Sequence, residues 1–246
     1  MSSEVEVYDS VKLSFTRRLN LTNMVRPQDI GSCNINKCLY IFDYRGHLDE
    51  SNEIMRVDSN GNLIKNWSTG DDTGNSLSVT EDSNVILTVY HANRLNEYSS
   101  DGLLIRAINM SSDALIQNPR HAVKLNSNRF VVSHGARGNN LHRVCIVDAD
   151  GKQIKSFAET RRLDIGQMNC PVYLSVDANG FVLVADQGNS RVLLLDSNLK
   201  LVGEILSEQN HGLRRVWRIL LDSLNNRLLV AEDQSGSAGR VMIFQL

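Results

Sequence analysis

The two cysteines of the segment CNINKC, Cys33 and Cys38, are the first residues whose type and spacing suggest metal chemistry. A structural zinc site needs four thiolate or imidazole ligands at short spacings, and the sequence around this pair offers no second pair. The other cysteines, Cys145 and Cys170, stand alone. We therefore expect reduced thiols, with no disulfide framework, no metal site and no cofactor.

Six histidines could take part in acid–base catalysis. The pair Ser133 and His134 lacks a Gly-x-Ser-x-Gly elbow, and no glycine-rich phosphate-binding loop occurs. Any chain with this many histidines contains Ser, His and Asp residues that could be named as a triad. Their presence in the sequence is therefore no evidence of catalysis. We expect the chain not to be an enzyme.

Clusters of arginine and histidine suggest recognition instead. A guanidinium group presents a planar fork of donors that binds carboxylates and phosphates and stacks on flat groups. The candidate binding residues are Arg120, His121, His134, Arg137, Arg161, Arg162, His211, Arg214 and Arg215. Which of these can act together depends on the elements that carry them.

Those elements belong to a repeat of about 45 residues, a period typical of propeller blades. In the best copy a short strand and a turn precede the apolar strand FVLVAD and the polar corner DQGNS. A strand that begins at an arginine follows, and the turn DSNLK leads to a more amphipathic fourth strand. Four antiparallel strands per copy, without helices between copies, predict an all-β propeller.

The best copy also carries a family resemblance. Its order of proline, apolar strand, Asp-x-x-Gly turn, strand ending in Ala-Asp and x-Asn-x-Arg-Val resembles the NHL repeat. The matching residues are Pro171, Asp177, Gly180, Ala185, Asp186, Asn189, Arg191 and Val192. The second and third copies depart from it, because Tyr90 and His134 replace the aspartate that ends strand two. The resemblance covers residues 26–246 and implies an NHL-type propeller, as in the carboxyl-terminal domain of tripartite-motif proteins.

The strand count predicts an incomplete ring of four-stranded blades. We expect a half blade at 1–20, full blades at 26–67, 75–108, 118–157 and 169–206, and a three-stranded blade at 213–246, all in one domain. A six-bladed plan with one incomplete blade is favoured over five blades in which the strands of both ends share a sheet. Unpaired strand edges tend to aggregate or to recruit other strands.

In such a propeller the loops between strands two and three and between blades emerge on one rim. We expect all six histidines and most arginines on this rim, and the Asp-rich turns on the other. The repeated arginines Arg94, Arg143, Arg191 and Arg240 are expected to brace the corner. The candidate binding residues lie in the more variable positions.

The partner predicted for this rim is a protein or peptide. Acidic residues such as Asp71, Glu159 and Asp233 fall on the same rim and nearly cancel its arginines, and a mixed-charge surface suits a protein partner. By resemblance to tripartite-motif proteins, the chain would be the substrate-recognition part of a ubiquitin ligase. RNA binding on the same rim is the alternative, with Tyr44, Tyr90 and Trp217 available to stack on bases.

A second alternative is a calcium-dependent lactonase or esterase, as in other propellers. Calcium needs several converging oxygen ligands, and the expected inner strands DIGSC, SLSVT, HAVKL, YLSVD and WRILL supply almost no carboxylates. Asp43, Asp186 and Glu232 end second strands, where we expect them to cap turns.

Composition places the chain among folded globular proteins. It has 246 residues, a net charge of −2 and 41% hydrophobic residues, which is enough to bury a full core. The opening MSSEVEVYDS does not read as a secretion signal, and no long apolar run occurs. We expect a cytoplasmic protein that does not bind membranes, and nothing in the sequence indicates oligomerisation.

Overall fold

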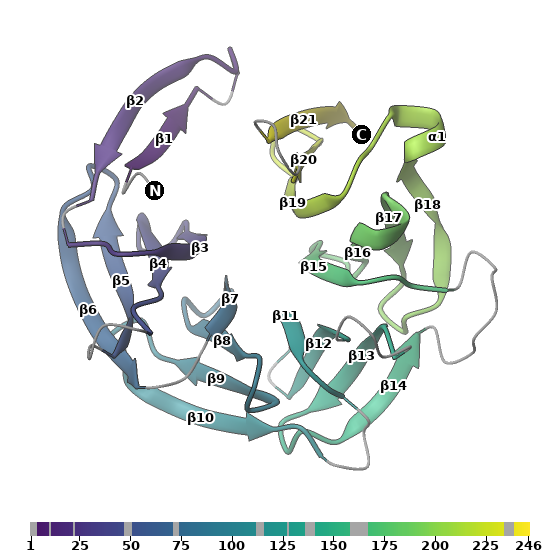
Figure 1. The fold of residues 1–246 in the computed structure, drawn as a ribbon, viewed down its shortest axis with the longest axis horizontal. Coiled ribbons are helices and arrows are strands. Elements are labelled where there is room, and N and C mark those ends of the chain that lie inside the picture. The colour runs from purple at the N-terminus through teal and green to yellow at the C-terminus, as the bar shows by residue number, and fades with distance from the viewer. Residues whose placement is uncertain are drawn as a thin grey trace. The chain divides into compact units, whose positions relative to one another are not determined.

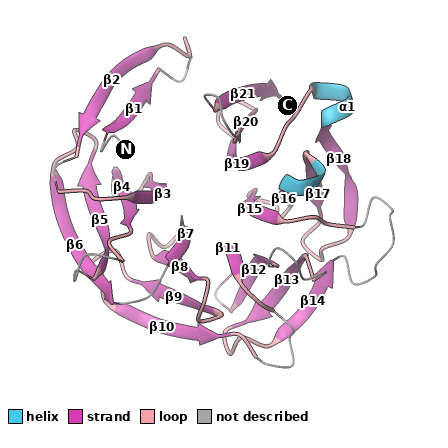
Figure 2. Ribbon diagram, in the orientation of Figure 1, coloured by secondary structure: helices cyan, strands magenta, loops and turns pink. Residues whose placement is uncertain are grey.

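The structure, a computed structural model, describes residues 4–9, 11–21, 23–46, 51–70, 74–111, 116–126, 128–135, 141–157, 167–233 and 239–246. The chain forms two compact units, one of residues 1–89 and 96–107 and one of residues 90–95 and 108–246. Each unit consists of small antiparallel sheets (Figures 1 and 2).

The strands up to residue 109 form a two-stranded sheet, β1–β2, and two four-stranded sheets, β3–β6 and β7–β10. Their bounds are β1 Glu4–Tyr8, β2 Phe15–Asn20, β3 Pro27–Cys33, β4 Cys38–Asp43, β5 Asn52–Asp58, β6 Leu63–Gly70, β7 Gly74–Val79, β8 Val85–Val89, β9 Arg94–Tyr98 and β10 Leu104–Asn109.

The strands after residue 109 form two four-stranded sheets, β11–β14 and β15–β18, and a three-stranded sheet, β19–β21. Their bounds are β11 Pro119–Asn126, β12 Arg129–His134, β13 Arg143–Asp148, β14 Gln153–Phe157, β15 Pro171–Val176, β16 Val182–Asp186, β17 Arg191–Leu195, β18 Leu201–Ser207, β19 Val216–Asp222, β20 Arg227–Glu232 and β21 Arg240–Gln245. A 3-10 turn, η2, spans Gln187–Asn189, and one helical turn, α1, spans Glu208–His211.

The predicted all-β class and the four-stranded blades are confirmed. The five sheets with three or four strands match the five-blade alternative, and the hairpin β1–β2 stands before them. Within the predicted half blade at 1–20, the second strand of that hairpin begins at Phe15, and a turn precedes it. The reason is local, because the Asp9 carboxylate accepts the N–H groups of Val11 and Lys12 and holds them in a turn.

One turn recurs before the fourth strand of every four-stranded sheet. The residue at the end of strand three, or directly after it, donates its N–H to the carbonyl four residues ahead. Its side chain accepts the N–H groups two and four residues ahead. This residue is Asp58, Ser99, Asp148 or Asp196. A short side-chain oxygen fixes this turn, so the repeated Asp or Ser sets the hairpin in each blade.

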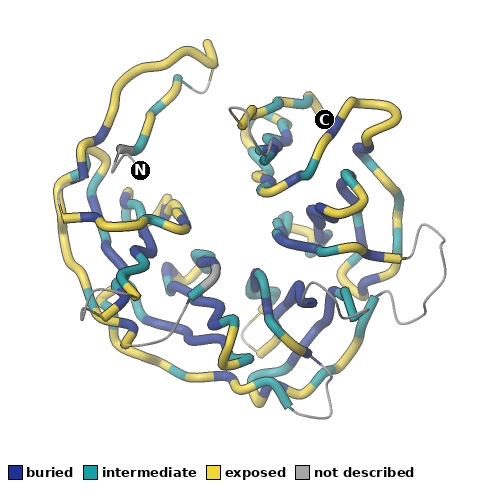
Figure 3. The backbone as a smooth tube through the Cα atoms, viewed as in Figure 1, coloured by how far each residue is buried: buried dark blue, intermediate teal, exposed yellow. Residues whose placement is uncertain are grey.

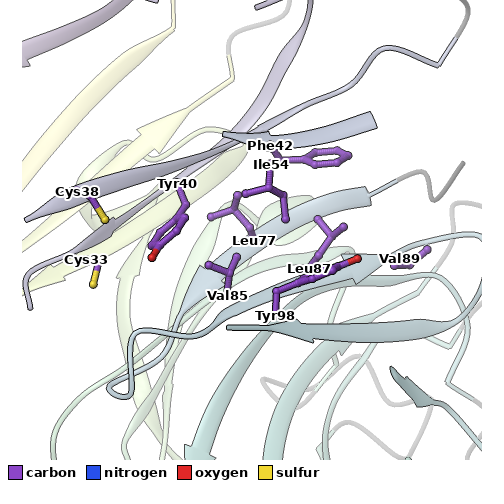
Figure 4. Packing of buried hydrophobic residues seen from close by; sticks show 10 residues of the cluster. All are labelled: Cys33, Cys38, Tyr40, Phe42, Ile54, Leu77, Val85, Leu87, Val89 and Tyr98. Carbon is purple, nitrogen blue, oxygen red and sulfur yellow. The ribbon is translucent and has the colours of Figure 1, made fainter. Parts of the chain in front are cut away.

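The apolar cores lie between neighbouring sheets within each unit. In the first unit, Phe42 and Ile54 pack with Leu77, Val85 and Leu87, and all five side chains are buried (Figure 4). In the second unit, one cluster joins β11–β14 to β15–β18 and another joins β15–β18 to β19–β21. The second strands β8 and β16 are buried along their whole length, whereas the fourth strands β6 and β10 are largely exposed (Figure 3). Burial on both faces explains why the second strands are continuous apolar runs.

Among the described residues, the helical segments are too short to cross a bilayer.

Candidate binding surface

In each of the five sheets with three or four strands, the first strand carries a bulge at its second residue. The pairing with strand two shifts after Pro27, Gly74, Pro119, Pro171 and Val216. The residue after each bulge is Asp29, Ser76, His121, Tyr173 or Arg218. Bulges change the direction of side chains, so these five residues hold equivalent places in their sheets.

In the second unit, three of these equivalent residues form a row in which each side chain contacts the next. The rings of His121 and Tyr173 stack with centroids 3.8 Å apart and planes at 23°. The guanidinium of Arg218 lies 5.1 Å from the centroid of the Tyr173 ring. First strands β11, β15 and β19 are thereby joined by a row of planar groups.

His121 also links two sheets through a hydrogen bond. Its side chain is 1% exposed, and the N–H of Leu174 on β15 donates to its Nδ1 over 3.2 Å. Asp29 does the same in the first unit, where its carboxylate accepts the N–H of Leu77. We conclude that His121, a predicted binding residue, holds two blades together and lies below the surface.

His134 is buried as well. It ends β12, is 1% exposed, and its Nε2 lies 3.3 Å from the Sγ of the buried Cys145. Burial, followed by the nearby charges of Arg143 and His142, lowers the pKa of His134 to about 4. A neutral imidazole inside the sheet replaces the corner aspartate, and a large partner does not reach it.

The corner that ends strand two is braced by a carboxylate and an arginine. In the fourth full blade, the buried Asp186 accepts the N–H of Asn169 over 2.8 Å and the Nε–H of Arg191 over 2.8 Å. Arg191 also donates to the carbonyl of Gln167 over 2.6 Å. Burial raises the pKa of Asp186, while these hydrogen bonds favour its charged form.

The same brace recurs in two other blades. Glu232 accepts the N–H of Arg214 and the Nε–H of Arg240, which also donates to the carbonyl of Gly212. In the first unit, Asp43 accepts the N–H groups of Val25 and Arg26.

The arginine of that third brace is Arg45, two residues after Asp43; it donates to the Asp43 carboxylate and to the carbonyl of Asn23. The predicted turn-capping role of the three carboxylates is confirmed, as is the bracing role of Arg191 and Arg240.

Arg120 occupies the bulge of β11 and is half-buried. Its Nε lies 3.3 Å from the carbonyl oxygen of Gly135, and its guanidinium lies 4.9 Å from the centroid of the Tyr90 ring. Tyr90 in turn meets the ring of His91 edge-on at 4.8 Å. These contacts fix Arg120 against its own unit.

The most accessible predicted residues gather in the segment before β19. His211 and Arg214 are exposed, and Arg215 is half-buried. The ring of His211 meets Phe244 of β21 edge-on at 5.7 Å, and its Nδ1 accepts the N–H of Ser207 over 3.3 Å. We name His211, Arg214, Arg215 and Trp217 the last-blade surface.

Contacts with neighbouring residues fix the shape of the last-blade surface. Arg215 has a φ of 44°, its N–H donates to the Oγ of Ser190, and its guanidinium lies 3.5 Å from the Asp233 carboxylate. Trp217, in the bulge of β19, is 43% exposed. An exposed arginine, a paired arginine and an exposed indole in one short segment offer both charge and a flat apolar contact, a combination enriched at protein interfaces.

Three predicted binding residues, Arg137, Arg161 and Arg162, lie outside the described residues, as does His47. Among the described residues, no three His, Cys, Asp or Glu side chains are grouped to hold a metal ion. The cysteines Cys33, Cys38, Cys145 and Cys170 are free thiols.

The contacts of Tyr173 with His121 and with Arg218 were not predicted from the sequence. Aligning the copies on the residue that starts strand one, Pro119, Pro171 or Val216, would have placed the three at the same position. That they touch could not be read from the alignment, because the contact depends on how far apart neighbouring first strands lie.

No family model matches the chain, and no curated protein matches it. Membership in the NHL family therefore stays a prediction.

Many solved structures are similar to this one, and three of them serve as examples. A streptogramin B lyase is 14% identical, with a TM-score of 0.60, over 99% of this chain and 72% of its own. A hydrazine synthase of Kuenenia stuttgartiensis is 12% identical, with a TM-score of 0.63, over 99% and 90%. A virginiamycin B lyase from Staphylococcus aureus is 14% identical, with a TM-score of 0.58, over 93% and 73%. At these identities the likeness shows the fold alone, and that fold is a β-propeller.

Proposed function

We propose that this chain is a non-catalytic recognition module that binds a protein or peptide partner through the last-blade surface. The observation that carries the proposal is the exposure of His211, Arg214 and Trp217 within seven residues, beside the half-buried pair of Arg215 and Asp233. Arginine and tryptophan are the side chains that contribute most to protein interfaces.

The charge of this surface favours a protein over a nucleic acid. Arg215 is already paired with Asp233, and Glu208 is exposed in the neighbouring turn α1. Nucleic-acid binding draws on a clear local excess of positive charge, whereas charges of both signs select among protein partners. An acidic and aromatic peptide matches Arg214 and Trp217 best.

RNA is the second candidate, because Trp217 is 43% exposed only three residues after Arg214. An exposed indole stacks on unpaired bases, and a nearby arginine pairs with phosphate. The roles as substrate-recognition part of a tripartite-motif ubiquitin ligase and as a cytoplasmic protein stay predictions from the repeat resemblance and the sequence.

Selection from a displayed library of random peptides tests the proposal. We expect enrichment of acidic and aromatic peptides, and at least a tenfold loss of affinity for them in the double variant Arg214→Glu/Arg215→Glu. The matched control is Arg17→Glu/Arg18→Glu, which reverses two exposed neighbouring arginines on β2 and should leave the peptide affinity unchanged.

A pool of single-stranded RNA provides the competing arm. RNA binding that weakens steeply with salt and is lost in the Arg214→Glu/Arg215→Glu variant would replace the protein partner with RNA. Peptides that bind the double variant as well as the wild type would sink the proposal.

A further inference from the structure

The last sheet differs from the four-stranded sheets at its third strand. In those sheets strand three lies between strands two and four, whereas β21 is the edge of the order β19–β20–β21. Strand three is mainly buried in the four-stranded sheets, but β21 alternates between exposed and half-buried residues. The edge of the last sheet is therefore open over the described residues.

The backbone of β21 is oriented to take a further strand. The register is regular from Glu232↔Arg240 to Arg227↔Gln245, and the N–H of Leu246 donates to the carbonyl of Asn226, on the β20 side. Because successive residues of a strand point their backbone groups to opposite sides, the N–H and C=O groups of Val241, Ile243 and Gln245 face the open side.

In the fourth full blade, the residue equivalent to Gln245 confirms the direction of this backbone N–H group. Asp186↔Arg191 aligns with Glu232↔Arg240, so Asp196 corresponds to Gln245. The N–H of Asp196 points to its fourth strand and donates to Lys200. Gln245 stands where the other blades have Asp or Ser, and its side chain donates to the carbonyls of Asn225 and Asn226. The Asp or Ser turn that leads into a fourth strand is absent from this position.

Charge indicates what kind of strand fits this edge. The corner arginine Arg191 also contacts Glu204 of the fourth strand, with Nη1 and Oε2 3.5 Å apart, and its side chain is only 10% exposed. Glu204 stands opposite Leu193, the residue equivalent to Met242. Arg240 holds the same position as Arg191 and makes the same brace, yet its side chain is 45% exposed.

We infer that β21 binds an extended segment of a partner protein, which adds to the last sheet as an antiparallel fourth strand. Apolar residues stand at alternate positions of this segment. The segment also carries Asp or Glu opposite Met242, within reach of Arg240. Main-chain hydrogen bonds supply affinity, and the acidic residue fixes the register. This site lies at the sheet edge, apart from the last-blade surface, and does not depend on that surface binding a partner.

A peptide copied from the chain's own fourth strand is a suitable probe. The capped peptide KLVGEILS reproduces residues 200–207 and contains the acidic residue that meets Arg191. We expect saturable binding in a fluorescence titration, with shifts of the amide signals of Val241, Ile243 and Gln245 in nuclear magnetic resonance spectra. Replacing the glutamate of the peptide with Gln should weaken binding about threefold, and with Lys about tenfold.

A matched pair of protein variants separates strand addition from other contacts. Ile243→Pro removes an N–H on the open side, where an edge strand tolerates proline, whereas Ile243→Ala keeps it. We expect Ile243→Pro to lose at least tenfold in affinity and Ile243→Ala to stay within about threefold. Arg214→Glu/Arg215→Glu should keep most of the affinity, so failure here is distinct from failure of the proposed function.

Three results would overturn the inference. The first is no saturable binding of the peptide to the wild type. The second is equal binding by Ile243→Pro and Ile243→Ala. The third is a concentration-dependent dimer in sedimentation that Ile243→Pro abolishes, because the strand that occupies β21 would then come from a second copy of this chain.

Discussion

The Nε of Arg191 lies 2.8 Å from a carboxylate oxygen of Asp186, a residue with no exposed surface. The same arginine closes the preceding loop by donating to Gln167. A single buried ion pair therefore ties the end of strand two to the loop that precedes strand one.

This pair predicts a large loss of stability when the arginine is removed. Arg191→Leu leaves a carboxylate buried without its cation, which costs about 3–5 kcal/mol of unfolding free energy. The equivalent change at Arg240, whose side chain is 45% exposed against 10% for Arg191, should cost less. Urea denaturation of both variants measures the difference, and an equal loss in the two would show that burial of the pair does not set its strength.

Acid should destabilise the fold through His134. Its pKa is about 4 in the folded chain against an ordinary value of 6.5, because burial and the charges of Arg143 and His142 disfavour the imidazolium. Above pH 6.5 the imidazole is neutral in both the folded and the unfolded chain, and the free energy of unfolding keeps its full value. As the pH decreases toward 4, this free energy falls by about 3 kcal/mol in total.

Urea denaturation from pH 7 to pH 4 measures that loss. His134→Gln cannot titrate, so its stability should change less over this range than that of the wild type. An unchanged slope in the variant would assign the acid sensitivity to other groups.

Adding one methyl group at Gly151 should disturb the contact of the turn before β14 with Asn109, a residue of the same unit. Gly151 has a φ of 78°, a Cβ there would meet the carbonyl oxygen of Asn109, and its own carbonyl accepts the N–H of Ser111. We expect Gly151→Ala to lower the unfolding free energy by about 3 kcal/mol.

The control for this change is Gly212→Ala. Gly212 has a similar φ of 65° but no atom within 4 Å of the Cβ position, so it should lose only the backbone term of about 1 kcal/mol. Thermal unfolding of both variants separates the steric effect from the conformational one. Equal losses of stability in the two variants would refute the steric effect at Gly151.

The row of His121, Tyr173 and Arg218 predicts coupling between three blades. Tyr173→Leu keeps apolar volume but removes the stack with His121 and the contact with Arg218. We expect a loss of about 1–2 kcal/mol. In a double-mutant cycle with Arg218→Met, a coupling energy near zero would show that the two residues touch without contributing to stability.

The sequence alone determined the repeat, and with it most of the strands. Apolar runs such as FVLVAD predict second strands because both faces are buried, and each Asp or Ser turn predicts the following hairpin. The roles of Asp186 and Arg191 could also be foreseen, because both ends of that brace lie at fixed positions of one repeat copy.

Only the tertiary structure decided which predicted residues reach the surface. His121 and His134 were expected to bind a partner, yet both are 1% exposed. Residue type does not predict this burial, because the burial of an imidazole depends on the sheet packed beside it. His211 and Arg214, between β18 and β19, are exposed. The open edge of β21 emerged in the same way, since a missing neighbour becomes visible only when strands are paired in space.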